Sequence, residues 1–141
     1  MTQTQINPTD TELLATAARL SDAFSDRAVE FDQARRLSQD ASDAMAQAGF
    51  YRLFVPEHLG GLEASPVISA KIFERLAQGN AACGWVAFIA ATSGSTLGSI
   101  PQDTARTIFS HPNTMVAGVF APSGKATVKA GEVTVEGRWQ W

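Results

Sequence analysis

The chain has 141 residues, of which 45% are hydrophobic and 18% are charged, and its formal net charge is −3. This length allows one domain with a substantial apolar core, and the composition is typical of soluble globular proteins. The 11 lysine and arginine residues are scattered without forming a basic stripe, so the charge pattern argues against a nucleic-acid partner.

The N-terminus and the cysteine content favour a cytoplasmic protein. Residues 1–12 are polar and lack the basic and apolar regions of a secretory signal. The single cysteine, Cys83, cannot form an internal disulfide and is compatible with a reducing compartment. Residues 76–102 carry no charge and are long enough to cross a bilayer, but only residues 81–91 are predominantly apolar. We therefore expect a helix buried inside the protein and no membrane span.

Apolar residues at steps of three and four predict two helices in the first third of the chain. The first begins at Asn7 and Pro8, a favoured cap followed by a favoured first residue. The second begins after Ser38 and stops at Gly49. The first helix is expected to bury one stripe, formed by Leu13, Ala17, Leu20, Phe24, Ala28 and Phe31.

Three more helices are predicted before residue 111. The third opens at Ser65, which is followed by a proline. The fourth, central helix covers residues 81–99 and is capped by Asn80. It is apolar or small on every side, as expected for a helix enclosed by others. A short fifth helix covers residues 101–110.

The character of the sequence changes after the fifth helix, where short β-strands are predicted. The second and third strands are expected to pair through a turn at Ala130-Gly131, which sets Lys129 opposite Glu132. The first strand is expected to be buried. The expected strands are residues 115–120, 125–129 and 132–141.

The predicted fold class is mainly α. An N-terminal helical bundle of about five helices, in residues 1–112, is followed by the first strands of an antiparallel β-domain, in residues 113–141. Three short strands are marginally stable alone and would leave an unpaired edge. We therefore expect the native polypeptide to continue, or another chain to supply the rest of the sheet.

The final strand carries two tryptophans on one face. Side chains alternate along a strand, so Val133, Val135, Trp139 and Trp141 lie on the same side. Two indoles directed at one surface require a cofactor, a partner or further chain to cover them. The competing interpretation is that these tryptophans belong to the core.

The turn after the first predicted strand offers complementary groups. It reads Phe120-Ala121-Pro122-Ser123-Gly124 and provides backbone N–H groups and a hydroxyl. An isoalloxazine ring binds flat apolar side chains on its face and a few donors at its polar edge. The tryptophans match the first requirement and the Ser-Gly turn matches the second.

Small and hydroxyl-bearing residues surround Gly94 in the central helix. They either permit close helix packing or line a substrate cavity, in which case the donors would be Thr92, Ser93, Ser95 and Thr96. No metal site is expected, because Cys83, His58 and His111 are far apart and no short ligand spacing occurs. Motifs of nucleophilic catalysis and of phosphate-binding loops are absent from the sequence.

The loop of residues 49–61 contains an initial Gly, a Val-Pro-Glu triplet and a final Gly-Gly pair. It resembles the loop after the second helix in the acyl-CoA dehydrogenase superfamily, and the helix order and the strands after Thr114 are similar as well. The resemblance implies a flavoenzyme, usually a homotetramer, with flavin between the β-domain and a C-terminal helical domain. The flavin contacts that it implies are Phe120, Ala121, Pro122, Ser123, Trp139 and Trp141.

The sequence departs from the acyl-CoA dehydrogenases proper at residues 121–126. Their Thr-Glu-Pro turn and Gly-Ser-Asp are replaced by Ala-Pro-Ser-Gly-Lys-Ala, and their Gly-x-x-x-Gln-Lys segment is absent. This pattern is more similar to the flavin-dependent hydroxylase branch. Its two-component monooxygenases take reduced flavin, FAD or FMN, from a separate reductase and hydroxylate aromatic or related substrates. Some place a histidine in the central helix. Residues 81–100 have none, so that role is either empty in this chain or taken by a residue such as Ser93.

Three functions stay open at this point. The first is a flavin-dependent monooxygenase with a small-molecule substrate and a flavin reductase as partner, represented by its N-terminal portion. The second is an FAD-dependent acyl-CoA dehydrogenase, whose catalytic carboxylate belongs to the C-terminal domain, so no catalytic residue is assigned. The third is a non-catalytic helical module that binds a partner through the strand edge. The 141 residues alone are expected to be inactive and colourless.

Overall fold

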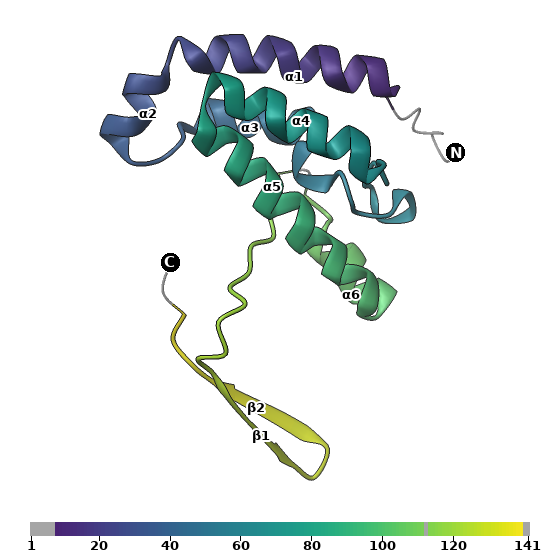
Figure 1. The fold of residues 1–141 in the computed structure, drawn as a ribbon. Helices are drawn as coiled ribbons and strands as arrows, with labels where there is room; N and C mark the ends of the chain where they lie inside the picture. The colour runs from purple at the N-terminus through teal and green to yellow at the C-terminus, as the bar shows by residue number, and fades with distance from the viewer. Residues whose placement is uncertain (1–7, 112, 140–141) are drawn as a thin grey trace.

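The computed structural model describes residues 8–111 and 113–139, and shows a helical body from which one β-hairpin projects (Figure 1). The prediction of a mainly α fold followed by antiparallel strands is confirmed. The α-helices are α1 (Asp10–Ser25), α2 (Ala28–Ala34), α3 (Gln39–Gln47), α4 (Pro66–Gly79), α5 (Ala81–Ser95) and α6 (Gln102–Ile108). The 3-10 helices are η1 (Phe50–Arg52), η2 (Glu57–Leu59) and η3 (Thr96–Ser99), and the strands are β1 (Lys125–Lys129) and β2 (Glu132–Glu136).

The first predicted helix is divided into α1 and α2, so the described residues form six α-helices where five were predicted. A capping box begins α1, in which Glu12 N–H donates to Thr9 Oγ1 at 3.3 Å and Thr9 N–H donates to Glu12 Oε2 at 2.7 Å. The cap is therefore Thr9, and Asn7 lies outside the described residues. The predicted stripe packs inward except at half-buried Ala28. Its buried members are Leu13, Ala17, Leu20, Phe24 and Phe31.

An ionic cluster ties the junction of α1 and α2 to the start of α3. Arg27 pairs with Glu30 at 2.8 Å and with Asp40 at 2.5 Å. Ser38 occupies the N-cap position of α3, as predicted, but its hydroxyl accepts a hydrogen bond from Arg27 at 2.9 Å instead of capping the helix. Arg35, with φ of 53°, ends α2 in the left-handed region.

The loop after α3 is tight and largely buried, as predicted. Gly49 adopts φ of 77°, which a side chain would resist, and ends α3. Backbone hydrogen bonds join Leu62 N–H to Arg52 O and Ala64 N–H to Leu53 O, at 3.0 and 2.7 Å. The loop therefore folds back on itself and buries its apolar side chains against the helices. Those fully buried are Phe50, Leu53 and Val55.

Helices α4 and α5 start where predicted, because their caps satisfy free backbone N–H groups. Ser65 Oγ accepts from Ile68 N–H at 3.3 Å, and Asn80 Oδ1 accepts from Ala82 N–H at 3.0 Å. Gly84 permits close packing, since a Cβ there would lie 2.6 Å from Ala77 Cβ in α4.

The expectation that the central helix is enclosed on every side is wrong for this chain. One face of α5 packs on α4 and the preceding loop, but Trp85 on the opposite face is 57% exposed and Phe88 is also exposed. No described element lies over that face, which leaves it in contact with solvent. By length and composition alone, residues 81–99 could cross a membrane, a test that core helices of soluble proteins also pass.

Residues 114–124 contain no strand, so the predicted buried strand at 115–120 is wrong. The segment has no described strand beside it to accept its hydrogen bonds, and Phe120 is 93% exposed. Only Val116 packs on an apolar cluster, the one around Phe109 at the end of α6.

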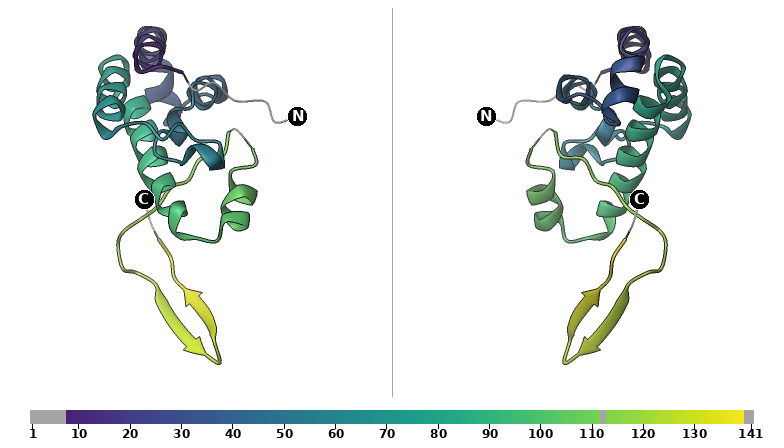
Figure 2. Two further views of the ribbon diagram at one scale, coloured as in Figure 1. Left: turned by 90° about the vertical axis from the view of Figure 1, so that its right-hand side faces the viewer. Right: turned by 90° about the vertical axis from the view of Figure 1, so that its left-hand side faces the viewer.

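Strands β1 and β2 form an antiparallel hairpin with the predicted register, including Lys129 opposite Glu132. Ala130 and Gly131 form the turn with φ of 50° and 85°. β2 is shorter than the predicted strand of residues 132–141 and ends at Glu136. Every residue of both strands is exposed, and Figure 2 shows the hairpin extending away from the helices. The division into domains at residue 112 stays a prediction.

Candidate functional site

A small groove lies where the end of α5 and η3 face residues 116–120, and we call it the Ser93 groove. Its volume is about 160 Å³. It brings two predicted substrate-binding residues, Ser93 and Thr96, together with Phe120, a predicted flavin contact. The third predicted substrate residue, Thr92, does not line the groove. Its full lining is Ser93, Thr96, Val116, Ala117, Gly118, Val119 and Phe120.

The hydroxyl groups near this groove differ in their availability. Thr92 Oγ1 donates to Phe88 O at 2.7 Å, and Thr96 Oγ1 donates to Ser93 O at 2.7 Å. Ser95 Oγ donates to Thr92 O at 2.6 Å. Three hydroxyls thus donate hydrogen bonds to carbonyl groups of the helix backbone, which is common for Ser and Thr inside helices.

Ser93 is the exception among these hydroxyl residues. Its side chain is buried, and its Oγ has no hydrogen-bond partner within residues 8–111 and 113–139. It faces Gly118, where a Cβ would lie 3.8 Å from Ser93 Oγ. A hydroxyl without a protein partner at the wall of a groove can donate a hydrogen bond to a ligand that enters it.

The predicted flavin-binding turn is exposed and partly closed on itself. Ser123 N–H donates to Ala121 O at 2.8 Å. The prediction that the turn offers its backbone N–H groups to a ligand is therefore wrong for Ser123. Ala121, Pro122 and the Ser123 side chain are exposed and open to a ligand.

Trp139 lies beside this turn, so the structure joins the two segments predicted to contact flavin. Its indole covers the backbone of Gly124 and Gly137, where an added Cβ would lie 2.6 and 2.5 Å from the six-membered ring. The indole remains 43% exposed. Trp141, the other tryptophan predicted to contact flavin, lies outside the described residues.

The linker into the β region is held by residues that the sequence reading did not single out. Arg52 Nη2 donates to His111 O, and its guanidinium lies 5.2 Å from the centre of the Phe109 ring. Asn113 Nδ2 donates to Asp43 Oδ1 at 2.7 Å. These contacts fix the chain on both sides of residue 112, just before it enters the Ser93 groove.

Arg52 is unusual because it is buried without an acidic partner in the described part of the chain. Its Nε also lacks a hydrogen-bond partner there, and burial lowers the pKa of its guanidinium. One signal for it was available in the sequence: it is the only charged residue in the apolar run of residues 50–55.

Other titratable groups do not form a reactive centre. Burial raises the pKa of Cys83 to about 11, so its thiol is protonated and unreactive at neutral pH. Burial also raises the pKa of Tyr51, whose hydroxyl lies 2.9 Å from Ser42 Oγ. Among the described residues, no three His, Cys, Asp or Glu side chains come close enough to hold a metal ion.

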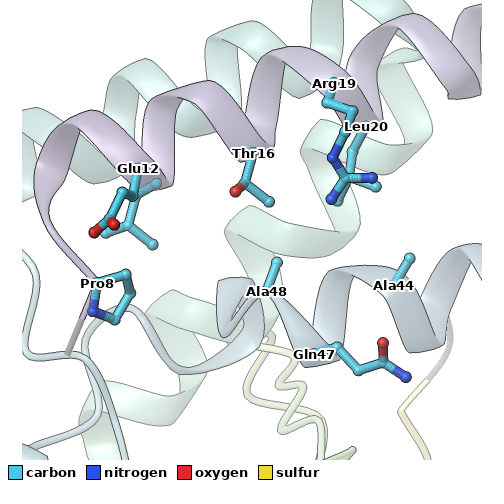
Figure 3. A pocket seen from close by; sticks show the side chains of 9 residues that line it. Pro8, Glu12, Thr16, Arg19, Leu20, Ala44, Gln47 and Ala48 are labelled. Carbon is cyan, nitrogen blue, oxygen red and sulfur yellow. The ribbon is translucent and has the colours of Figure 1, made fainter. Parts of the chain in front are cut away.

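A larger groove, of about 380 Å³, lies between α1 and α3 (Figure 3). Thr16 and Arg19 extend from α1 over Ala44 of α3 and over Ala48, which follows the last residue of that helix. Its carboxylate, Glu12, is already engaged by Thr9, and that hydrogen bonding lowers the pKa of Glu12. The groove contains none of the predicted site residues, so its size alone does not make it the candidate site.

Comparison with known proteins gives a consistent result. Residues 7–102 match the family described as acyl-CoA dehydrogenase, N-terminal domain. The chain is 36% identical over 125 residues to indole-3-acetate monooxygenase of Pseudomonas putida, covering 86% of this chain and 32% of that protein. It is 30% identical over 117 residues to HsaA, the oxygenase subunit of a flavin-dependent monooxygenase of Rhodococcus jostii (strain RHA1), covering 82% and 31%.

The fold has a solved counterpart as well. The crystal structure of the HsaA monooxygenase from M. tuberculosis superposes with a TM-score of 0.87 at 28% sequence identity, covering 95% of this chain and 37% of that one. The chain therefore spans about a third of the length of the relatives it matches.

Proposed function

This chain belongs to the acyl-CoA dehydrogenase family, and we propose from that premise that it is the N-terminal portion of the oxygenase component of a two-component flavin-dependent monooxygenase. The family predicted from the loop of residues 49–61 is confirmed, and the relatives are flavin-dependent monooxygenases. The reaction, the substrate and the partners of the whole protein are part of the proposal.

The Ser93 groove is the observation that carries this proposal. Substrate and flavin have to meet in one place, and the groove joins a residue from each predicted set, Ser93 and Phe120. Ser93 supplies an unused hydroxyl in a largely apolar wall, because the hydroxyl of Thr96 is bonded to the helix backbone. Such a wall with one polar group suits a small aromatic compound that is held by packing and oriented by one hydrogen bond. The name of the Pseudomonas relative makes indole-3-acetate the first compound to test.

The residues of the β region fit a flavin ring. Trp139 presents an exposed indole surface beside glycine backbone, and the Ser123 hydroxyl is exposed on the adjoining turn. We assign flavin contact to Phe120, Ala121, Pro122, Ser123, Trp139 and Trp141. When bound, reduced flavin supplies the electrons with which oxygen is activated for hydroxylation.

The protein residues have three roles in this scheme. Ser93 donates a hydrogen bond that orients the substrate. Val116 packs on the α6 cluster and, with Arg52 and Asn113, holds the linker that forms the opposite wall. The apolar residues of that wall, Val116, Ala117, Val119 and Phe120, supply surface on which the substrate packs.

We further propose a separate flavin reductase as partner, a homotetramer and a cytoplasmic location. A separate reductase is suggested by the name of the Rhodococcus relative, which describes an oxygenase subunit. Both FAD and FMN are kept as candidate flavins.

The test uses protein expressed from the complete reading frame that contains this chain. Reduced FAD or FMN is supplied with oxygen and indole-3-acetate, and the hydroxylated product per flavin oxidised is measured by mass spectrometry. Ser93→Ala is expected to lower the product yield roughly three- to tenfold, the effect of one lost hydrogen bond. Ser99→Ala, an exposed serine of η3 outside the groove, is expected to leave it unchanged.

Two results would contradict the proposal. Reduction of an artificial electron acceptor with an acyl-CoA, without any hydroxylation, would instead identify an acyl-CoA dehydrogenase. A complete protein that binds neither FAD nor FMN would instead identify a non-catalytic module.

A further inference from the structure

We infer that Gly124 and Gly137 form a seat that fixes the Trp139 indole, and that this seat presents the indole to a flat ring of a bound ligand. The two glycines are positioning residues and do not themselves touch the ligand. That the ring belongs to flavin rests on the proposed function; that the indole is held by the two glycines does not.

The geometry of the seat comes from the close approach of two backbone segments, one at Gly124 and one that carries Gly137 and Trp139. A Cβ on Gly124 would lie 2.6 Å from Trp139 Cζ2 and 3.0 Å from Cη2. A Cβ on Gly137 would lie 2.5 Å from Trp139 Cη2 and 2.9 Å from Gly124 Cα. Real Cβ atoms do not approach other atoms this closely, so the indole can occupy this position only because both residues lack a side chain.

Backbone conformation does not explain these glycines. The glycines with positive φ among the described residues are Gly49, Gly60 and Gly131. Alanine is therefore allowed by the backbone dihedral angles at 124 and 137. The requirement at 124 is space for the indole, and at 137 it is space for the indole and for Gly124 Cα. Gly124→Ala consequently tests the contact with the indole, whereas Gly137→Ala also displaces the backbone of Gly124.

The strand does not position Trp139 by itself. β2 ends at Glu136, so the alternation of side chains along a strand stops three residues before the tryptophan. Trp139 also belongs to neither of the two apolar clusters formed by the described residues. An indole on such a segment would rotate among several side-chain rotamers, and contact with the glycine backbone restricts that freedom.

The exposed part of the indole is available to a second ring. With 43% of the residue exposed and its six-membered ring against the glycines, Trp139 has one supported side and one open side. A supported aromatic surface beside the exposed Ala121–Ser123 turn suits stacking of a planar ligand, because less freedom is lost when the ligand binds.

The experiment follows the indole directly in protein expressed from the complete reading frame and labelled with 5-fluorotryptophan. The 19F resonance of residue 139 is assigned with Trp139→Phe. Gly124→Ala and Gly137→Ala are each expected to shift or broaden this resonance, in the absence of flavin. Gly98→Ala is the matched control, because a Cβ there would meet no atom within 4 Å.

Flavin affinity is then measured by fluorescence titration with oxidised FAD and FMN. Each seat variant is expected to bind roughly three- to tenfold more weakly than the Gly98→Ala control, the range for one aromatic stacking contact. The double variant Gly124→Ala/Trp139→Phe, in which a smaller ring relieves the clash, is expected to regain thermal stability lost in Gly124→Ala.

Each outcome decides one part of the inference. An unchanged resonance in both alanine variants overturns the seat, whatever the flavin result. A changed resonance with unchanged flavin affinity overturns the presentation of the indole to the ligand. If wild-type protein binds no flavin while the resonance still changes, the seat stands and the proposed function fails.

Discussion

The helical body and the segment after it use apolar residues in opposite ways. In residues 10–109, apolar side chains form two buried clusters, with Phe50, Ile72 and Leu76 fully inaccessible. In β1 and β2 every residue is exposed, including three valines. A helix forms its backbone hydrogen bonds within itself and needs neighbours only to bury its apolar face. A strand needs neighbours both for its backbone hydrogen bonds and for the burial of its apolar face. A helical segment can therefore complete its core from this chain, while the hairpin depends on further surfaces.

The largest effect expected from this comparison is in the loop under the helical body. Phe50→Ala removes a fully buried ring and should lower the free energy of unfolding by about 3–5 kcal/mol. Val135→Ala, in the exposed hairpin, should change it by less than about 0.5 kcal/mol. Urea denaturation of both variants measures the difference. Equal losses would show that the hairpin is buried in solution and that Val135 is not exposed.

The connection between the two regions gives an intermediate effect. Arg52→Met removes the hydrogen bond to His111 O and the contact with the Phe109 ring, and should cost about 1–3 kcal/mol. Hydrogen exchange should then become faster in residues 113–120, because the linker loses its hydrogen bond to Arg52. Arg106→Met, on the exposed face of α6, is the matched control and should alter neither quantity. Unchanged exchange in Arg52→Met would mean that Asn113 and Asp43 suffice to hold the linker.

The smallest effect concerns the exposed ionic cluster that joins α1, α2 and α3. Hydrogen bonding to Arg27 holds the pKa of Asp40 below its usual value of about 3.9 and that of Glu30 below its usual range. A lowered pKa in the folded state stabilises the protein fully above the pKa of the unfolded chain. That contribution is lost as the pH falls below about 4 and through the folded-state pKa.

The measurement for this cluster is urea denaturation between pH 6 and pH 3. Asp40→Asn should lower stability slightly near pH 6 and flatten the pH dependence below about pH 4, with a smaller difference at high salt. Asp103→Asn, whose carboxylate pairs at 3.3 Å with a neighbour on its own helix, is the matched control. Parallel pH profiles of wild type and Asp40→Asn would contradict a role for the cluster.

Sequence periodicity and capping predicted the helical body well. The cap residues Ser65 and Asn80, the stop at Gly49 and the Ala130-Gly131 turn lie where expected. These features depend on interactions within about four residues, so the local sequence contains the needed information. The predicted strand at 115–120 failed because an apolar run becomes a strand only when another strand lies beside it.

The candidate site was only partly predictable from the sequence. Sequence reasoning selected Ser93, Thr96 and Phe120, which line one groove, but it could not distinguish the hydroxyl of Ser93 from that of Thr92. That distinction depends on which of the hydroxyls donates a hydrogen bond to a carbonyl group of the helix backbone. Arg52 was passed over because its role depends on His111, which lies 59 residues further along the chain.

By itself, the sequence determined most of the helices, the caps of α4 and α5, the hairpin register and the family of this protein, because each depends on residues close together along the chain. The tertiary structure alone decided that Ser93 faces Gly118, that Arg52 is buried against the linker and that Trp139 rests on two glycines. These contacts join segments distant in sequence or depend on a local path of the backbone, and packing selects them only once the elements have assembled.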